Sequence, residues 1–106
     1  MAPVATLNSD KTAELAEMLA IMGEPNRLRS IMACLHAERA VGALAEELGL
    51  SPSLASHHLR LLRAARILRG RRDGKNVFYT AADGHVRSMI SDMIDHVLEA
   101  AGADDG

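Results

Sequence analysis

Apolar residues recur at helical spacing in three short segments of the first half of the chain. Each segment places apolar side chains at positions i, i+3, i+4 and i+7, the pattern of a helix that buries one face. The three sets are Leu15, Met18, Leu19 and Met22; Leu28, Ile31, Met32 and Leu35; and Val41, Leu44, Ala45 and Leu48. The pattern therefore predicts three short amphipathic helices in succession.

Capping and turn residues indicate where these helices begin and end. Ser9 or Asp10 can cap the first helix, and Pro25 suits the first turn of the second, where a backbone N–H is not needed. Gly49 is expected to end the third helix, and Ser51-Pro52 to start a fourth after a three-residue link. Two helices joined by so short a glycine-containing turn form the helix-turn-helix plan.

A β-hairpin is expected after the fourth helix. Residues 67–72 and 75–80 flank Asp73-Gly74, a strong two-residue turn signal, and the second segment contains the good strand formers Val77, Phe78 and Tyr79. Arg71, Arg72 and Lys75 make the tip of this hairpin basic. The hairpin would lie beside the fourth helix as a wing.

A last helix is predicted from about Asp83 to Ala100, ended by Gly102 and an acidic tail. Its apolar face is wider than a small domain needs in order to pack on itself. That face comprises Val86, Met89, Ile90, Met93, Ile94, Val97 and Leu98. The width of the face suggests that a second copy of the chain covers it.

These elements predict a mainly α fold with a small β-hairpin, a dimeric winged helix-turn-helix. With 106 residues, 48% of them hydrophobic, the chain can build one buried core but hardly two. We expect a flexible N-terminus over residues 1–9, one domain over residues 10–100 that dimerises through its first and last helices, and an acidic tail over residues 101–106.

The net charge of -2 conceals a strong asymmetry along the chain. Residues 51–80 contain seven Lys and Arg against a single Asp, a net charge of +6, so the remaining residues carry -8. A concentrated basic stripe attracts a polyanion locally, because screening over about 8 Å lets near charges dominate far ones. The alternative is a solvated, arginine-rich surface.

Composition argues against several other classes of protein. Two aromatic rings make a poor stacking surface for unpaired bases, and the single cysteine, Cys34, forms neither an internal disulfide nor a thiolate metal site. Cys34 lies in an apolar run, which favours a buried structural thiol over a ligand.

The longest uncharged apolar stretch is far shorter than a membrane span, and the N-terminus lacks the plan of a secretory signal. We expect a cytoplasmic protein with no membrane partner and no small organic substrate.

The fourth helix combines an apolar side with a polar side suited to the major groove of DNA. At 100° per residue, five side chains share one 120° face: Ser53, Ser56, His57, Arg60 and Arg63. Hydroxyl and imidazole groups exchange hydrogen bonds with base edges, and arginine forks onto guanine or phosphate. Arg69, Arg71, Arg72 and Lys75 of the wing are expected to contact the adjacent backbone or minor groove. The rival interpretation is a protein-interaction domain with ordinary surface residues here.

Four potential metal ligands lie on the last helix in two pairs, Asp83 with His85 and His96 with Glu99. His85 and His96 are about 16 Å apart along the helix but only about 20° apart around it. Ligands of one zinc ion lie within a few ångströms of each other, so one chain offers two half-sites. An antiparallel partner helix would bring Asp83 and His85 of one subunit to His96 and Glu99 of the other. The rival interpretation is two solvated histidines with carboxylates that stabilise the helix end.

Two imidazoles and two carboxylates suit tetrahedral Zn²⁺, with Co²⁺ as the alternative ion, and disfavour copper(I) and arsenic. Four protein ligands would leave no open position for a catalytic water, and the sequence has no nucleophile motif or phosphate loop. We therefore expect no catalytic residues and no enzyme activity. A winged-helix repressor that responds to another metal, such as cobalt or nickel, or to a non-metal effector, stays open as the competing interpretation.

Over roughly residues 15–100 the sequence resembles the ArsR/SmtB family of bacterial metal-responsive repressors. Three segments carry the resemblance: residues 23–29 are similar to the helix-opening segment of the family, residues 50–62 to its recognition helix, and residues 73–79 to its wing. The four residues Asp83, His85, His96 and Glu99 look like the family's C-terminal zinc site, with the same spacing. The third helix has no cysteine pair, which departs from the thiolate sensors of arsenic and cadmium.

The resemblance implies a zinc sensor. It further implies that the metal-free dimer binds an imperfect palindromic operator and that zinc lowers its affinity for DNA. The N-terminal segment lacks Cys and His, so the family's second, N-terminal metal site is not expected in this chain.

Overall fold

The computed structural model describes residues 6–103 and contains five helices and one small sheet. The helices are α1 (Ser9–Met22), α2 (Pro25–Ala33), α3 (Val41–Leu48), α4 (Pro52–Ala64) and α5 (Gly84–Ala103). The strands are β1 (Arg39–Ala40), β2 (Leu68–Asp73) and β3 (Asn76–Ala81). Residues 1–5 of the expected flexible N-terminus and residues 104–106 of the expected acidic tail lie outside the described part of the chain.

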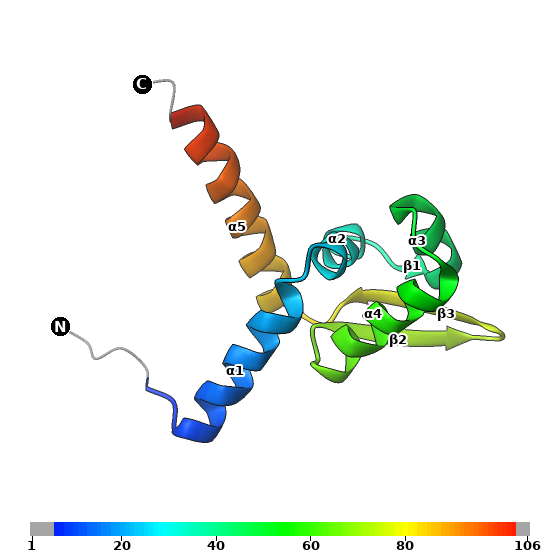
Figure 1. Ribbon diagram of the computed structural model, residues 1–106, viewed down its shortest axis with the longest axis horizontal. Helices are drawn as coiled ribbons and strands as arrows, with labels where there is room; N and C mark the ends of the chain where they lie inside the picture. Colours follow the sequence, from blue (N-terminus) through cyan, green and yellow to red (C-terminus); the bar gives the residue numbers. More distant parts are fainter. Residues whose placement is uncertain (1–5, 104–106) are drawn as a thin grey trace.

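Helices α2, α3 and α4 and the sheet form a body from which α1 and α5 project on one side (Figure 1). The Cα radius of gyration is 15.8 Å. A compact domain of this length would have a radius of about 13 Å. The difference agrees with Figure 1, in which the outer parts of the two terminal helices extend beyond the body.

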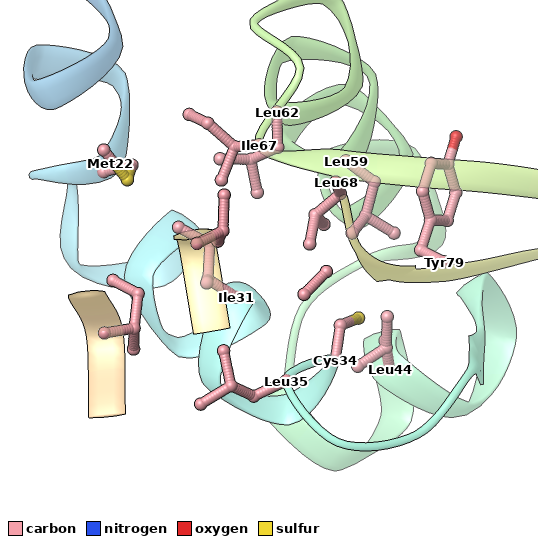
Figure 2. Packing of buried hydrophobic residues seen from close by; sticks show 13 residues of the cluster. Met22, Ile31, Cys34, Leu35, Leu44, Leu59, Leu62, Ile67, Leu68 and Tyr79 are labelled. Carbon is pink, nitrogen blue, oxygen red and sulfur yellow. The ribbon is translucent and has the colours of Figure 1, made fainter. Parts of the chain in front are cut away.

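The core lies between α2, α3, α4 and the sheet, and Figure 2 shows how its side chains converge. Ile31, Leu59 and Leu62 have no exposed surface, and neither does Ile67 just before β2. Cys34 is also fully buried, and desolvation raises the pKa of its thiol to about 12. The expectation of a buried thiol is therefore confirmed.

The helix-turn-helix and its caps agree with the sequence pattern. Gly49 adopts a φ of +69° at the end of α3, and three residues separate α3 from α4. The Ser51 hydroxyl accepts a hydrogen bond from the Leu54 N–H at 3.1 Å, and Pro52 occupies the first turn. For α1, however, the expected cap was wrong: the side chain of Asn8, just before the helix, accepts the hydrogen bond from Lys11 N–H at 2.8 Å.

The hairpin turn is displaced by one residue from its predicted position. Asp73 pairs with Asn76, so the two turn residues are Gly74 and Lys75 rather than Asp73 and Gly74. Gly74 has a φ of +63°, and Lys75 is not among the residues with positive φ. A glycine with positive φ in the first central position is the pattern of a type II′ turn, which fits the twist of a hairpin.

The sheet has a third strand that the sequence analysis missed. The short strand β1 pairs antiparallel with β3, Arg39 opposite Tyr79, and the strand order is β1-β3-β2. A two-residue strand has too few positions to show alternation, so the sequence carries no periodic signal for it. The last helix also runs three residues further than predicted, through Gly102 to Ala103.

Candidate DNA interface and metal half-sites

Helix α4 presents its polar face outward. Ala55, His58, Leu59 and Leu62 are buried against the body, which fixes the rotation of the helix. The five predicted DNA-facing residues lie on the opposite side, where Ser56 is half-buried and Ser53, His57, Arg60 and Arg63 are exposed. The surface that the sequence analysis proposed for base and phosphate contacts is therefore accessible.

The wing divides its four basic residues between two faces and the tip. Alternation along β2 puts Arg69 and Arg71 on one face and Arg72 on the other, where Gly70 also lies, while Lys75 lies in the turn. Arg71 Nε donates to Glu38 Oε2 at 2.9 Å, and its guanidinium lies 4.9 Å from the centre of the Phe78 ring. Arg71 thus already has partners within the chain.

A polar cluster behind α4 escaped the sequence analysis. The Glu24 carboxylate accepts a hydrogen bond from the Arg27 N–H at 2.8 Å at the start of α2, and this bond lowers the pKa of Glu24. The buried imidazole of His58 lies beside both residues, 3.5 Å from Arg27 Nη1 and 3.9 Å from Glu24 Oε2. Burial lowers the pKa of His58. The position of His58 on the apolar side of α4, next to the exposed His57, was the available sequence signal.

Asp83 and His85 form a pair at the start of α5. Asp83 caps the helix through Oδ1, which accepts a hydrogen bond from the Val86 N–H at 3.0 Å, and this bond lowers the pKa of Asp83. Its other oxygen, Oδ2, lies 3.7 Å from Nδ1 of His85. Two ligands of a tetrahedral zinc ion with bonds near 2.1 Å are about 3.4 Å apart. This pair is therefore spaced as a chelating half-site would be.

His96 and Glu99 lie three residues apart on α5, where i, i+3 side chains are neighbours on the helix surface. Both are exposed, as are Asp83 and His85. Within residues 6–103, however, no three His, Cys, Asp or Glu side chains come close enough together to hold a metal ion. The donor types fit zinc, but a single chain brings them together only in pairs.

An apolar groove runs along α5 beside the end of α2. It is lined by Leu28, Met32, Ile90, Met93, Ile94, Val97 and Leu98. Val86 and Ile90 are buried in the body, and Arg87 Nε fixes the first turns of α5 by donating to Leu35 O at 3.1 Å. Further along, Met93, Val97 and Leu98 are 54%, 63% and 65% exposed. The broad face predicted from the sequence is therefore only partly covered by the chain itself.

The sequence and structure are similar to those of bacterial regulators. Residues 24–69 match the sequence profile of the arsR family of bacterial regulatory proteins. A transcriptional repressor SmtB homolog from Synechocystis sp. is 36% identical over 94 residues, which span 89% of this chain and 71% of that protein. The chain belongs to the ArsR/SmtB family of bacterial regulatory proteins. It is therefore a transcription regulator and not an enzyme.

Solved structures show the fold of this ArsR/SmtB regulator independently. The crystal structure of NolR from Sinorhizobium fredii matches with a TM-score of 0.74 and 32% identity, covering 90% of this chain and 95% of that one. A homodimeric winged helix-turn-helix DNA-binding domain from Mycobacterium bovis matches with a TM-score of 0.79 at 23% identity, covering 93% and 91%. The predicted winged helix-turn-helix is confirmed. Among the described residues, no helix combines the length and hydropathy that a membrane crossing requires.

Proposed function

We propose that this regulator is a zinc-responsive transcriptional repressor. The metal-free homodimer binds a palindromic operator, and zinc bound between subunits releases it. The ligands of each zinc ion are Asp83 and His85 of one subunit with His96 and Glu99 of the partner subunit. The observation that carries the proposal is the Asp83–His85 pair, in which Oδ2 of Asp83 lies 3.7 Å from Nδ1 of His85. The same helix bears the second pair, His96 and Glu99, about three turns further along.

Helix α5 supports both the dimer and the site. At 100° per residue, His85 and His96 fall beside Met89 and Met93, along one edge of the apolar face. If two copies of α5 pack antiparallel on that face, each half-site lies next to the complementary half-site of the partner subunit. Burial of the exposed apolar side chains supplies the free energy of association.

DNA binding is assigned to α4 and the wing. Ser53, Ser56, His57, Arg60 and Arg63 face the major groove, and Arg69, Arg71, Arg72 and Lys75 contact the adjacent backbone or minor groove. In a twofold dimer the two α4 helices must fit half-sites about 34 Å apart, so a small change in their spacing weakens both contacts together. A zinc ion held by Asp83 and His85 of one subunit and the second half-site of the other would link the two α5 helices rigidly and so restrict that spacing.

The competing function is a repressor of the same fold that responds to cobalt, nickel or a non-metal effector. It is supported by the exposure of all four proposed ligands in the isolated chain. Side chains that only contact solvent and bind no metal would be exposed in the same way. Imidazole and carboxylate donors suit several divalent ions, so the choice of metal is decided by comparing affinities.

The deciding experiment measures DNA affinity with zinc and with a chelator at about 0.15 M salt. The probe is a duplex selected from a random library by the metal-free protein. We expect zinc to weaken binding at least fivefold, a typical lower bound for allosteric coupling. His96→Ala should abolish this response, while His36→Ala, which removes an exposed histidine from the segment between α2 and β1, should preserve it. An unchanged zinc affinity and an unchanged DNA response in His96→Ala would contradict the proposed site.

A further inference from the structure

Gly70 of β2 lies under the side chain of Arg63. A Cβ atom at Gly70 would be 3.3 Å from Tyr79 Cε1, 3.6 Å from Val77 Cγ1 and 3.7 Å from Arg63 Cδ. Unlike Gly49 and Gly74, Gly70 does not have a positive φ, so its backbone does not require glycine. What limits the position is space, because a Cβ would press on the Tyr79 ring and would lie in contact with the Arg63 side chain, which reaches this strand from α4.

The same place is the floor of a cleft of about 320 Å³ between α4 and the wing. Its lining includes Ser56, Arg60 and Arg63 of α4, Gly70 and Arg72 of β2, and Tyr79 of β3. Its three cationic groups come from two elements, because Arg60 and Arg63 lie one turn apart on α4 while Arg72 lies on β2. Tyr79 is a core residue, and Figure 2 shows its hydroxyl at the end of the ring away from Leu44.

The charge of this cleft is uncompensated, in contrast to neighbouring arginines. Arg66 pairs with Glu14 at 2.6 Å and Arg71 with Glu38 at 2.9 Å. Among the described residues, no carboxylate lies within 4 Å of the guanidinium groups of Arg60, Arg63 or Arg72. Three unpaired guanidinium groups around one cleft attract an anion, and each can donate two parallel hydrogen bonds to phosphate oxygens.

We propose that this cleft is a phosphate clamp, in which Arg63 of α4 and Arg72 of the wing hold the same backbone phosphate of duplex DNA. The inference rests on the proposed function, because it names the part of the DNA, a backbone phosphate, that binds in this cleft. Gly70 leaves the space in which the Arg63 side chain crosses the strand. Ser56 and Arg60, which also line this cleft, connect the phosphate contact to the base-reading face of α4.

The position of the cleft favours a DNA phosphate over a free nucleotide. A nucleotide would need a surface for its base, but Tyr79, the only ring among the described residues that line the cleft, is 5% exposed. The cleft opens between the two elements assigned to DNA, where a strand leaving the major groove passes the wing. A phosphate held from both sides would fix the angle between α4 and the duplex.

The test combines arginine variants with duplexes in which one phosphate at a time is replaced by an uncharged methylphosphonate. On unmodified duplex, Arg63→Gln and Arg72→Gln should each weaken binding about tenfold per half-site, the loss expected for one charge-assisted contact. At one phosphate position in each half-site, the methylphosphonate should weaken duplex binding by the wild type to a similar extent. On duplex modified there, both variants should bind with the same affinity as the wild type. Lys11→Gln, which removes one positive charge from α1, should show no coupling to any phosphate.

Two further measurements examine the clamp without relying on the arginine variants. Gly70→Ala should weaken DNA binding and reduce its coupling to the same phosphate, because the new methyl group presses on the Tyr79 ring and takes up space in the cleft next to Arg63. Gly42→Ala is the matched control, since a Cβ there meets no atom of residues 6–103 outside its own helix turn within 4 Å. In the double variant Arg63→Gln/Arg72→Gln, the slope of log affinity against log salt should become less steep by about 0.9 per half-site, the value for one lost phosphate contact.

The outcomes separate the clamp from the function on which it rests. If the wild type binds duplex but the two arginines couple to different phosphates or to none, the clamp is refuted and the repressor stands. If inorganic phosphate binds this cleft below millimolar concentration while no DNA phosphate couples, the cleft is a site for a free anion and the proposal fails. A wild type that binds no duplex at all refutes the proposed function and the clamp together.

Discussion

The guanidinium of Arg27 lies against the buried imidazole of His58, with Nη1 3.5 Å from Nδ1. Arginine only donates hydrogen bonds, so Nδ1 must be the acceptor, and the proton of the neutral ring is then on Nε2. That nitrogen is 3.9 Å from Oε2 of Glu24. The contact joins the start of α2 to the recognition helix α4, and it is made by the neutral form of His58.

Stability should therefore decrease as the pH falls below the ordinary histidine range. Burial is the main cause that lowers the pKa of His58; Arg27 and His57 lower it further, and Glu24 opposes them. Between the lowered folded pKa and about 6.5, the unfolded chain binds a proton that the folded chain does not. In that window the free energy of unfolding should decrease by at most about 1.4 kcal/mol per pH unit.

Urea unfolding at a series of pH values measures this effect. His58→Gln removes the titration and keeps an acceptor, so its stability should vary less as the pH falls below the ordinary histidine pKa of about 6.5. His36→Gln, which changes an exposed histidine that does not contribute to the lowered pKa of His58, should retain the wild-type dependence. Parallel curves for wild type and His58→Gln would show that His58 is not the responsible group.

Glu38 should act as an internal competitor of DNA for Arg71. Its carboxylate holds Arg71 at 2.9 Å while the Phe78 ring holds the same guanidinium from its face. Glu38→Gln removes a negative charge near the wing and releases Arg71 for a phosphate. We expect tighter binding to operator and random duplex by the same factor, with a steeper salt dependence. Glu17→Gln, an equal charge change on α1, is the control and should leave affinity unchanged.

The helices and their order could be predicted from the sequence because each buries a stripe at regular spacing. Ala55, Leu59 and Leu62 of α4 have the positions that the 100° rule gives them, and Gly49 and Ser51 mark the turn by their own chemistry. Strand β1 is too short to carry a pattern, and it forms only because β3 offers a free edge. The hairpin turn was shifted by one residue because Asp-Gly and Gly-Lys are both acceptable turn pairs.

The candidate site was predictable where it depends on one helix and less so where two elements meet. Placing the five polar residues of α4 on one face needed only helix geometry. Alternation along β2 could have separated Arg72 from Arg69 and Arg71 before the structure was known. The link between Arg71 and Glu38, and the space that Gly70 leaves for Arg63, depend on tertiary contacts across 33 and 7 residues that no local pattern records.

The apolar groove on α5 should be the dimer interface, so a charge in it should separate the subunits. Leu98 is 65% exposed in the isolated chain, and a twofold dimer would bury the Leu98 side chain of both subunits. Leu98→Glu should therefore cost about 3 kcal/mol or more of association free energy. Sedimentation equilibrium at micromolar concentration should show a monomer. Ser88→Glu, with the same charge on the opposite side of α5, should remain dimeric.

Mixed dimers provide the sharpest test of zinc sites shared between subunits. One variant lacks the first half-site, Asp83→Ala/His85→Ala, and the other lacks the second, His96→Ala/Glu99→Ala. Each homodimer then has two incomplete sites and should bind no zinc tightly. A heterodimer of the two unites the intact half-sites in one place, so it should bind one zinc ion where the wild-type dimer binds two.

The number of zinc ions bound per dimer distinguishes sites shared between subunits from sites built within one chain. A site built by a single chain would be broken in both variants, and mixing them would restore nothing. The subunits can be combined by co-expression with two different affinity tags, and zinc measured by competition with a chromophoric chelator. The control heterodimer joins the wild-type chain to the doubly defective chain Asp83→Ala/His85→Ala/His96→Ala/Glu99→Ala. It should bind no zinc, because each of its sites receives only one half from the wild-type subunit, and a bound ion there would refute shared coordination.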